Sequence, residues 1–434
     1  MMTDSLTRNS VNIMGTSVVN AGLGYVYWTV AARHMSAVSV GLGSAMISAM
    51  VILSLAVYLG PGGGLIARLP KRATRADWVA TALSAQLGCV AATAILAAAA
   101  LYPLAQLLPA LRPLATDPRA AAWFVLGAAG WTCSGLLDYI FIAERRSSLM
   151  LRRNASASVV KVASLFAVLA FGRHTGATAI LATWSLSGLT GSVSGLVLCH
   201  RRIHRLGPIP WRVLRREFAE LARPSLGHHA ISIGGLLPTY LLPVVVTARL
   251  GAQQNAYFYV TWMVGSSIFM ISPAVSSAIF AEGSHDAGRL RNLSGSSLRI
   301  ILAVVVPAVL VVGLAGRLIL SLFGHGYAVL GYPLLLILLA SSFPDAVTNI
   351  SVATLRVRGK LAAAAVLNGS MAVLSVAGAW ILAAHLSIRG AGAAWLIAQS
   401  AGALAVFVLH KRLWPPPDRE TAAPSARLDA REHN

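Results

Sequence analysis

Charged residues are scarce in this sequence, and acidic residues are the scarcest. Only 11% of the 434 residues are charged, against about 25% in an average soluble domain. Fourteen acidic residues face 35 lysines and arginines, and 56% of the chain is hydrophobic, with a mean hydropathy of +0.70. A soluble domain of this length has too little interior for so much apolar surface. The composition therefore excludes an ordinary soluble enzyme and indicates a protein that crosses a membrane several times.

Cysteine is equally rare. Cys89, Cys133 and Cys199 all lie inside or beside apolar runs. An odd number of cysteines argues against a disulfide framework, and none of the three has the spacing of metal ligands. We expect three small buried side chains, no metal site and no cofactor.

The formal net charge of +21 would by itself suit a nucleic-acid-binding protein. The basic residues, however, lie in short clusters between long apolar runs. This spacing is typical of membrane proteins, whose cytoplasmic loops are enriched in lysine and arginine. We therefore predict no nucleic-acid partner, and we expect anionic membrane lipids to contact the basic clusters.

Long apolar runs alternate with polar or Pro/Gly-rich breaks along the chain. Each run is far longer than a membrane-spanning strand of about 9–11 residues, so the runs are predicted to be helices. The sequence thus predicts an all-α polytopic membrane protein with 12 transmembrane helices. The twelve runs cover residues 11–32, 38–59, 78–102, 119–143, 156–172, 178–199, 225–247, 255–281, 298–322, 331–353, 361–385 and 391–410.

The basic residues are distributed unevenly between alternate loops. Loops on one side contain 27 of the 35, loops on the other side contain 7, and Lys161 alone remains inside a span. Because cytoplasmic loops attract basic residues, this bias places both termini in the cytoplasm. We expect a multi-pass protein of the cytoplasmic membrane.

The longest polar segment between apolar runs divides the chain into two similar halves. It contains seven arginines and two glutamates, and its apolar residues recur at helical spacing: Trp211, Leu214, Phe218 and Leu221. This pattern predicts an interfacial helix on an anionic inner leaflet. We therefore expect a six-helix lobe (1–199), a basic cytoplasmic linker (200–224), a second six-helix lobe (225–410) and a disordered cytoplasmic tail (411–434).

The two halves show signs of a duplication. Six spans in each half would leave both in the same orientation, as in a parallel repeat with a pseudo-twofold axis along the membrane normal. Asp138 and Asp345 are 207 residues apart, and so are Lys161 and Asn368. Arg33 and Arg249 each end the first span of their half. Two such lobes suit alternating access around a central cavity.

Charges inside a membrane are costly and are functional candidates. Asp138 and Lys161 lie at similar distances before and after a turn that we place near Leu149, so they could pair across neighbouring helices. The pair is either opened by a proton or an anionic substrate, or it ties the hairpin together. Asp345 has Asn368 rather than a cation at the matching position. It is the first candidate for coupling to a proton or sodium ion, with a hydrogen-bonded kink as the alternative.

Six further residues are weaker candidates for substrate binding or ion coupling: Arg33, Arg249, His228, His229, Asn20 and Tyr240. The two arginines end their spans on the outer side, where they could meet a phosphate or extend to lipid headgroups. The histidines begin the seventh span and could titrate near neutral pH. The asparagine and the tyrosine belong to spans that are too polar to face lipid all round.

The sequence resembles the multidrug/oligosaccharidyl-lipid/polysaccharide (MOP) exporter superfamily over residues 10 to about 412. The stretches that suggest this are VNIMGTSVVNAGLGYVYWTVAARHMSAVSVG and VVVTARLGAQQNAYFYVTWMVGSSIFMISPAVSSAIFAEGSHD. They look like the Wzx-type oligosaccharide flippase branch. The first span has no arginine within its core, unlike lipid II flippases, and no acidic residue, unlike many drug exporters. Both departures favour the polysaccharide branch.

The resemblance implies a transporter that flips a polyprenyl-pyrophosphate-linked oligosaccharide for cell-surface polysaccharide biosynthesis, with a proton or sodium gradient resetting the cycle. It also implies polysaccharide polymerases and glycosyltransferases as possible partners. The alternatives are a MATE-type cation-coupled multidrug antiporter and a membrane-embedded polysaccharide polymerase or ligase. The longest outer loop, residues 103–118, could not hold a catalytic domain, so we predict that the protein is not an enzyme.

Overall fold

The computed structural model describes residues 2–172, 176–222, 226–273 and 290–409, with side chains for all of these except 2–10, 222, 226–228 and 290–297. The predicted disordered tail lies outside the described residues. The first half contains α1 (Met2–His34), α2 (Ala37–Arg68), α3 (Arg75–Leu107), α4 (Pro113–Thr116), α5 (Pro118–Ala143), α6 (Ser147–Phe171) and α7 (Ala177–Arg202). After α8 (Trp211–Ala222), the second half contains α9 (Leu226–Leu250), α10 (Ala252–Phe269), α12 (Leu290–Ser321), α13 (His325–Val357), α14 (Leu361–Leu386) and α15 (Ile388–Val408).

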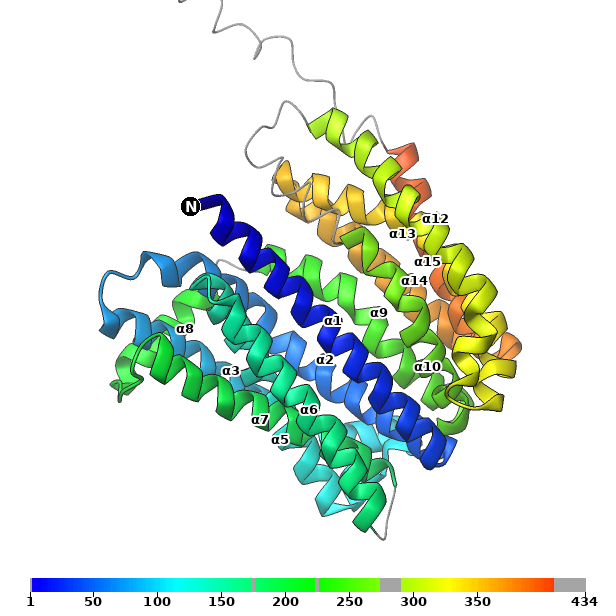
Figure 1. Ribbon diagram of the computed structural model, residues 1–434, viewed down its shortest axis with the longest axis horizontal. Coiled ribbons are helices and arrows are strands. Elements are labelled where there is room, and N and C mark those ends of the chain that lie inside the picture. Colours follow the sequence, from blue (N-terminus) through cyan, green and yellow to red (C-terminus); the bar gives the residue numbers. More distant parts are fainter. Residues whose placement is uncertain (1, 173–175, 223–225, 274–289, 410–434) are drawn as a thin grey trace, which may run out of the picture.

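The described residues form helices and no strands, which confirms the all-α prediction (Figure 1). A long helix covers at least part of each of the twelve apolar runs. Ten of the described helices are long and apolar enough to cross a membrane; α1 and α10 are not among them. The count of twelve spans and the cytoplasmic position of the termini therefore stay predictions.

Short polar side chains determine where several helices begin. The Ser36 hydroxyl accepts a hydrogen bond from the Ser39 amide at the start of α2. The Thr74 hydroxyl accepts one from the Asp77 amide at the start of α3. The Asp117 carboxylate caps α5, whose first residue is a proline. Each cap satisfies an amide that the helix itself leaves without a partner.

The helices of the two halves pack in the same order. In the first half α1 packs on α6, α2 on α5, α5 on α7, and α6 on α7. The corresponding helices of the second half pair in the same way: α9 with α14, α10 with α13, α13 with α15, and α14 with α15. The halves meet chiefly where α2 packs against α9 and α10. This shared pairing is what a duplicated fold requires.

The two halves do not match residue by residue at a constant spacing of 207, because α13 is longer than α5. Asp138 and Asp345 each lie twenty residues after the first residue of their helices, α5 and α13. Helix α13 then continues for seven residues more than α5, about two turns. Asn368 therefore lies seven residues into α14, level with Asn154 of α6 rather than with Lys161. Pairing Lys161 with Asn368 was thus wrong.

The closest approach between the halves involves Gly41 of α2. A Cβ atom at this position would lie 1.6 Å from the Ala252 carbonyl oxygen of α10. The side chain of Asn255, which is fully buried, donates hydrogen bonds to the Gly41 carbonyl at 2.8 Å and the Ser44 hydroxyl at 3.0 Å. Only glycine allows the two helices to approach closely enough for this contact.

We expect Gly41→Ala to push α2 and α10 apart and to destabilise the protein by about 1–3 kcal/mol, as overpacking a tight contact does. The measurement is thermal unfolding of the purified protein in detergent. Gly63→Ala is the matched control, because Gly63 lies on the same helix with nothing within 4 Å of the added Cβ. Equal stability of the two variants would show that the contact is not tight.

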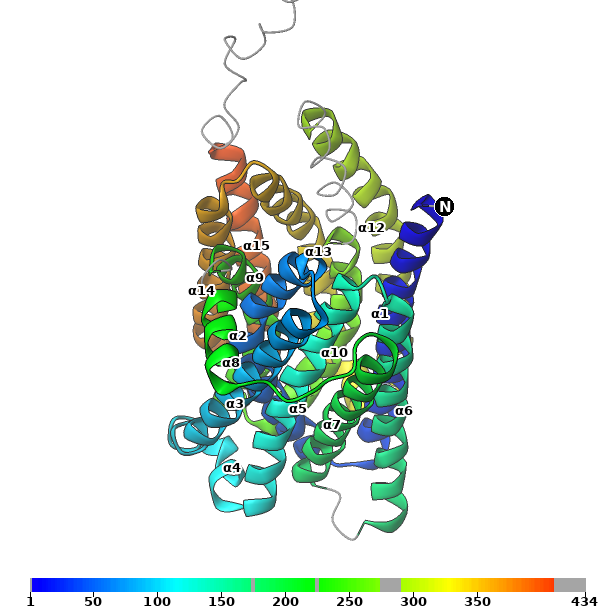
Figure 2. The ribbon, with the colours of Figure 1, turned by 90° about the vertical axis from the view of Figure 1, so that its left-hand side faces the viewer.

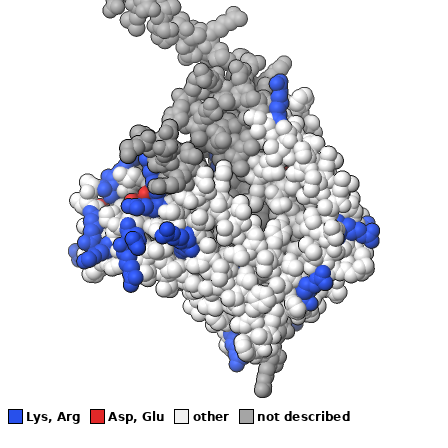
Figure 3. All heavy atoms as spheres, viewed as in Figure 1, with Lys and Arg blue, Asp and Glu red and all other residues white. Residues whose placement is uncertain are grey.

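Helix α8 packs on the protein through the side chains that were expected to lie on lipid. Leu221 is fully buried, and the Phe218 ring lies against Gly88 of α3. Glu217 accepts hydrogen bonds from Arg72 and Thr81. Trp211 remains 74% exposed. Figure 2 shows α8 beside the ends of α2 and α3, and Figure 3 shows basic side chains gathered in the same region.

Candidate functional site

A cavity of about 400 Å³ lies mainly in the first half. It is lined by α1, α2, α5, α6 and α7, and among the described residues of the second half by α10 and Met270 directly after it. The lining side chains on α5 and α6 recur at helical spacing: Trp131, Ser134, Gly135 and Asp138 on α5, and Asn154, Ala157, Ser158 and Lys161 on α6. Intervals of three and four residues place each set on one helix face. The small residues in these two sets, such as Gly135 and Ala157, leave room for the cavity between the larger side chains.

Lys161 is the cation on this cavity wall. Its side chain is almost buried, and its ammonium lies 4.4 Å from the Trp184 ring centre and 5.9 Å from the Tyr27 ring centre. No hydrogen bond or ion pair among the described residues involves its Nζ atom. Cation–π contacts are much weaker than a buried ion pair. Lys161 is therefore a positive charge without a counter-charge in the described part of the protein.

Asp138 pairs with Arg153 rather than with Lys161. Its Oδ1 atom accepts a hydrogen bond from Arg153 Nη2 at 2.6 Å and one from Asn154 Nδ2 at 2.9 Å. The turn between α5 and α6 spans residues 144–146, not the region of Leu149, so Arg153 is the basic residue level with Asp138. Lys161 is eight residues further along α6, about 12 Å by the helical rise. The predicted Asp138–Lys161 pair was therefore wrong.

Arg153 was also misplaced by the prediction, which counted it among cytoplasmic loop residues. Its side chain has no exposed surface, and it also donates hydrogen bonds to the backbone carbonyl and the hydroxyl of Ser134. Gly191 and Gly195 of α7 pack against the guanidinium and its methylene chain. The spacing of Gly191 and Gly195 on one face of α7 was the sequence signal that this face packs closely against another helix. The structure shows that Arg153 lies in this contact.

Asn20 is the other predicted candidate in this cavity. Its side-chain oxygen accepts a hydrogen bond from the Ser158 hydroxyl at 2.8 Å, which joins α1 to α6. Aromatic rings form much of the remaining wall. Trp131 stacks on Trp184 at 5.7 Å, and Trp28 lies 4.8 Å from Tyr259 of the second half. The sequence did not predict the three tryptophans as part of a site. Tyr259 belongs to a sequence cluster of aromatic residues that could either stack on sugar rings or form an aromatic belt at the outer interface.

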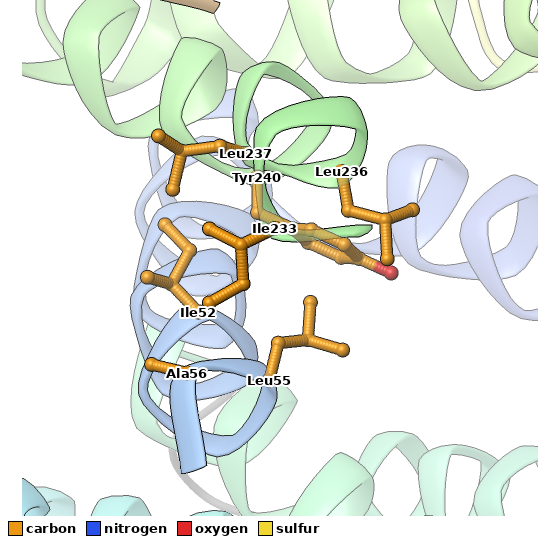
Figure 4. A pocket seen from close by; sticks show the side chains of 7 residues that line it. All are labelled: Ile52, Leu55, Ala56, Ile233, Leu236, Leu237 and Tyr240. Atoms are coloured by element: carbon orange, nitrogen blue, oxygen red, sulfur yellow. The ribbon is translucent and has the colours of Figure 1, made fainter. Parts of the chain in front are cut away.

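Tyr240 does not line this cavity. It lies at a much smaller apolar pocket of about 30 Å³ between α2 and α9. Figure 4 shows the side chains of both helices facing one another across it, with the Tyr240 hydroxyl as the only polar side-chain atom among those drawn. The pocket offers no group that would bind an ion or a charged substrate.

Asp345 lies in the second half, away from both recorded pockets. Its side chain is 5% exposed, and Oδ2 is buried without a hydrogen-bond partner among the described residues. The tryptophan that corresponds to Trp184 packs in an apolar cluster in this half. Trp395 and Trp184 each lie seven residues into their helices, but Trp395 packs against Trp262 in an apolar cluster that includes Leu338. Asp345 is thus a buried carboxyl group with one oxygen that has no hydrogen-bond partner among the described residues.

The other predicted residues have local contacts. Asn368 donates a hydrogen bond to the Ile231 carbonyl at 2.9 Å and so ties α14 to α9. The His229 ring packs on Gly60 of α2, and its Nδ1 atom has no partner among the described residues. The side chain of His228 lies outside the described residues. Neither Asn368 nor His229 lines the cavity.

Arg33 and Arg249 occupy matching places in the repeat but make different contacts. Arg33 donates hydrogen bonds to the carbonyls of Ser321 at 2.8 Å and Leu322 at 2.7 Å, at the end of α12. It therefore joins the two halves. Arg249 lies 5.3 Å from the centre of the Trp380 ring, within its own half. Neither arginine lines the cavity.

The part of the chain that the structure describes contains no group of three or more His, Cys, Asp or Glu side chains that could hold a metal ion. The three cysteines are buried and unpaired, as the sequence predicted. The site is therefore a cavity of aromatic rings, hydroxyl groups and two ionised side chains.

No protein-family model matches this sequence, and no curated protein matches it. Solved structures do match its fold. A structure described as the inward-facing conformation of a multidrug resistance MATE family transporter of the MOP superfamily has a TM-score of 0.74 at 15% identity. The match covers 94% of this chain and 98% of that one. The lipid II flippase MurJ in an inward closed conformation has a TM-score of 0.70 at 10% identity, over 91% of this chain and 86% of that one.

A third similar structure is the eukaryotic MATE transporter AtDTX14, with a TM-score of 0.67 at 14% identity, covering 93% of this chain and 96% of that one. At these identities the likeness shows the fold alone. The chain has the fold of MOP superfamily transporters, as its sequence resemblance implied. The Wzx-type branch and the cargo stay predictions.

Proposed function

With a MOP-type fold as the premise, we propose that this protein flips a lipid-linked oligosaccharide across the cytoplasmic membrane by alternating access. The carrier we propose is a polyprenyl pyrophosphate, and the product serves cell-surface polysaccharide biosynthesis. The observation that carries the proposal is the charge of the cavity. Lys161 and Asp138 are its only ionised lining residues among those described, and Arg153 neutralises Asp138 from behind. The cavity thus has one uncompensated positive charge, which a pyrophosphate group would neutralise.

The aromatic wall supports the same cargo. Trp28, Trp131, Trp184 and Tyr259 present broad apolar surfaces, and the serines on α5, α6, α7 and α10 present hydroxyl groups. A sugar ring has both apolar faces and hydroxyl groups, so it can stack on the rings and bond to the serines.

The contacts between the halves support alternating access. Three side chains in the C-terminal part of α1 contact the second half. Tyr25 donates a hydrogen bond to the Met263 carbonyl, the Trp28 ring contacts the Tyr259 ring, and Arg33 donates a hydrogen bond to the Leu322 carbonyl after α12. Asn20 and Gly15, nearer the N-terminus, contact α6 of their own half. We propose that these contacts close the cavity at the Arg33 end, which we assign to the outer side from the basic-residue bias.

A cation-coupled multidrug antiporter is the second candidate. The free oxygen of Asp138 and the surrounding tryptophans would also suit a lipophilic cation. The positive charge of Lys161 opposes such a cargo. Drug sensitivity of a host that lacks its own exporters tests this alternative directly.

The decisive experiment for the proposed function is depletion of the protein in its own host. We expect a lipid-linked sugar to accumulate in the inner leaflet and the surface polysaccharide to be lost, with both restored by the wild-type chain. Mass spectrometry of extracted polyprenyl lipids would identify the glycan. An unchanged lipid-linked pool, together with normal surface polysaccharide, would contradict the proposal.

We also propose that Asp345 couples transport to a proton or sodium ion, because its buried Oδ2 atom has no hydrogen-bond partner among the described residues and can accept a cation. Asp345→Asn keeps the shape and removes the charge. We expect gradient-driven transport in proteoliposomes to fall at least about tenfold, while exchange without a gradient continues. Equal gradient-driven rates for the variant and the wild type would exclude Asp345 from coupling.

A further inference from the structure

The carboxylate of Asp138 presents one oxygen to the protein and the other to the cavity. Oδ1 accepts the hydrogen bonds from Arg153 and Asn154. Oδ2 accepts none among the described residues, and it is not among their buried unpaired atoms. The Asp138 side chain is 30% exposed, whereas that of Arg153 is fully covered. Oδ2 is therefore an accessible acceptor at the cavity wall.

The surrounding contacts fix this oxygen in place. The guanidinium of Arg153 is held by Ser134 and the side chain of Asn154, as well as by Asp138 itself. Asn154 is held in turn by the carbonyl of Met150. A carboxylate that is anchored through one oxygen loses little further freedom when its second oxygen binds a ligand. An ionised carboxylate only accepts hydrogen bonds, so the ligand must donate.

We infer that Asp138 forms a second subsite in this cavity, for the hydroxyl or amino groups of a sugar, separate from the anion subsite at Lys161. The inference rests on the proposed function and adds the chemistry of the cargo to it. The two subsites lie about 12 Å apart along α6 by the helical rise. The cargo therefore combines an anionic group at one end with a donor-rich sugar at the other. Asp138 contacts the sugar, and Arg153 and Asn154 act as positioning residues.

The test uses the purified full-length protein in lipid nanodiscs and three probes measured by calorimetry. Inorganic pyrophosphate probes the anion subsite, and a glucosamine trimer probes the donor subsite. Tetraphenylphosphonium is a cation without hydrogen-bond donors, so it separates hydrogen bonding from attraction between charges. The central variant is Asp138→Asn/Arg153→Gln, which removes both charges and so leaves no buried charge unpaired.

We expect the double variant to bind the glucosamine trimer at least about tenfold more weakly than the wild type. Its affinity for pyrophosphate should be unchanged. Lys161→Gln should weaken the binding of pyrophosphate and leave the affinity for the trimer unchanged. Asn154→Ala keeps the ion pair and removes one anchor of Asp138, so it should give an intermediate loss for the trimer. It also keeps the inference testable if the double variant does not fold.

Equal affinity of the wild type and both Asp138-region variants for the trimer would overturn the inference, as would a wild type that binds pyrophosphate but not the trimer. Binding of tetraphenylphosphonium that depends on Asp138 as strongly as the trimer does would also overturn it, because hydrogen-bond donation would then be irrelevant. The failure of the proposed function looks different: no lipid-linked sugar accumulates on depletion, whatever the trimer does.

Discussion

Lys161→Gln is expected to reduce transport about 30- to 150-fold while leaving the protein as stable as the wild type, or more stable. The substitution removes the uncompensated charge from the cavity wall. An anionic cargo loses its counter-charge, and a charged hydrogen bond in a dry site contributes about two to three kcal/mol. Lys161 itself has no anionic partner among the described residues, so its charge costs folding energy that glutamine does not.

This combination separates function from folding. A purely structural lysine would give lost stability together with lost transport. The measurements are flipping of the extracted lipid-linked glycan in proteoliposomes and thermal unfolding in detergent, at matched protein abundance. Lys71→Gln is the control, because Lys71 is exposed in the short turn after α2 and does not line the cavity. Wild-type transport by Lys161→Gln would remove the anion subsite from the mechanism.

Arg33→Gln is expected to open the cavity more often toward the side on which Arg33 lies. Its two hydrogen bonds to the end of α12 join the two halves at that end. They also complement the partial negative charge of a helix C-terminus. Both bonds must break when the halves separate there. Because Arg33 is exposed, we expect a modest shift in the open population, about three- to tenfold.

The repeat provides the matched control for this prediction. Arg249 ends the corresponding helix but contacts Trp380 of its own half, so Arg249→Gln should leave the opening unchanged. The readout is the rate at which a membrane-impermeant maleimide labels Ser266→Cys, a cavity-lining position on α10. The three native cysteines are buried, which keeps the background low. Equal labelling rates in the Arg33 and Arg249 variants would show that Arg33 does not hold the halves together.

The sequence located the helices well because their signals are local. Apolar runs, caps such as Thr74 and breaks such as Gly359 each depend on a few neighbouring residues. The turn after α5 was misplaced because it lacks such a local signal. It contains no glycine or proline, and Arg145 itself adopts the left-handed conformation with φ of 53°. An error of about one turn in this loop was enough to pair Asp138 with the wrong cation.

What the sequence alone determined is the class of protein, the long helices and the presence of Asp138, Lys161 and Asp345 among them, because helical periodicity and the cost of buried charge act within one segment. Only the tertiary structure decided that Arg153 neutralises Asp138, that Lys161 lies against Trp184 with no counter-charge among the described residues, and that Asp345 is buried away from the cavity. These facts depend on which faces of distant helices meet. Two residues matched by spacing can therefore have unrelated surroundings, as Arg33 and Arg249 do.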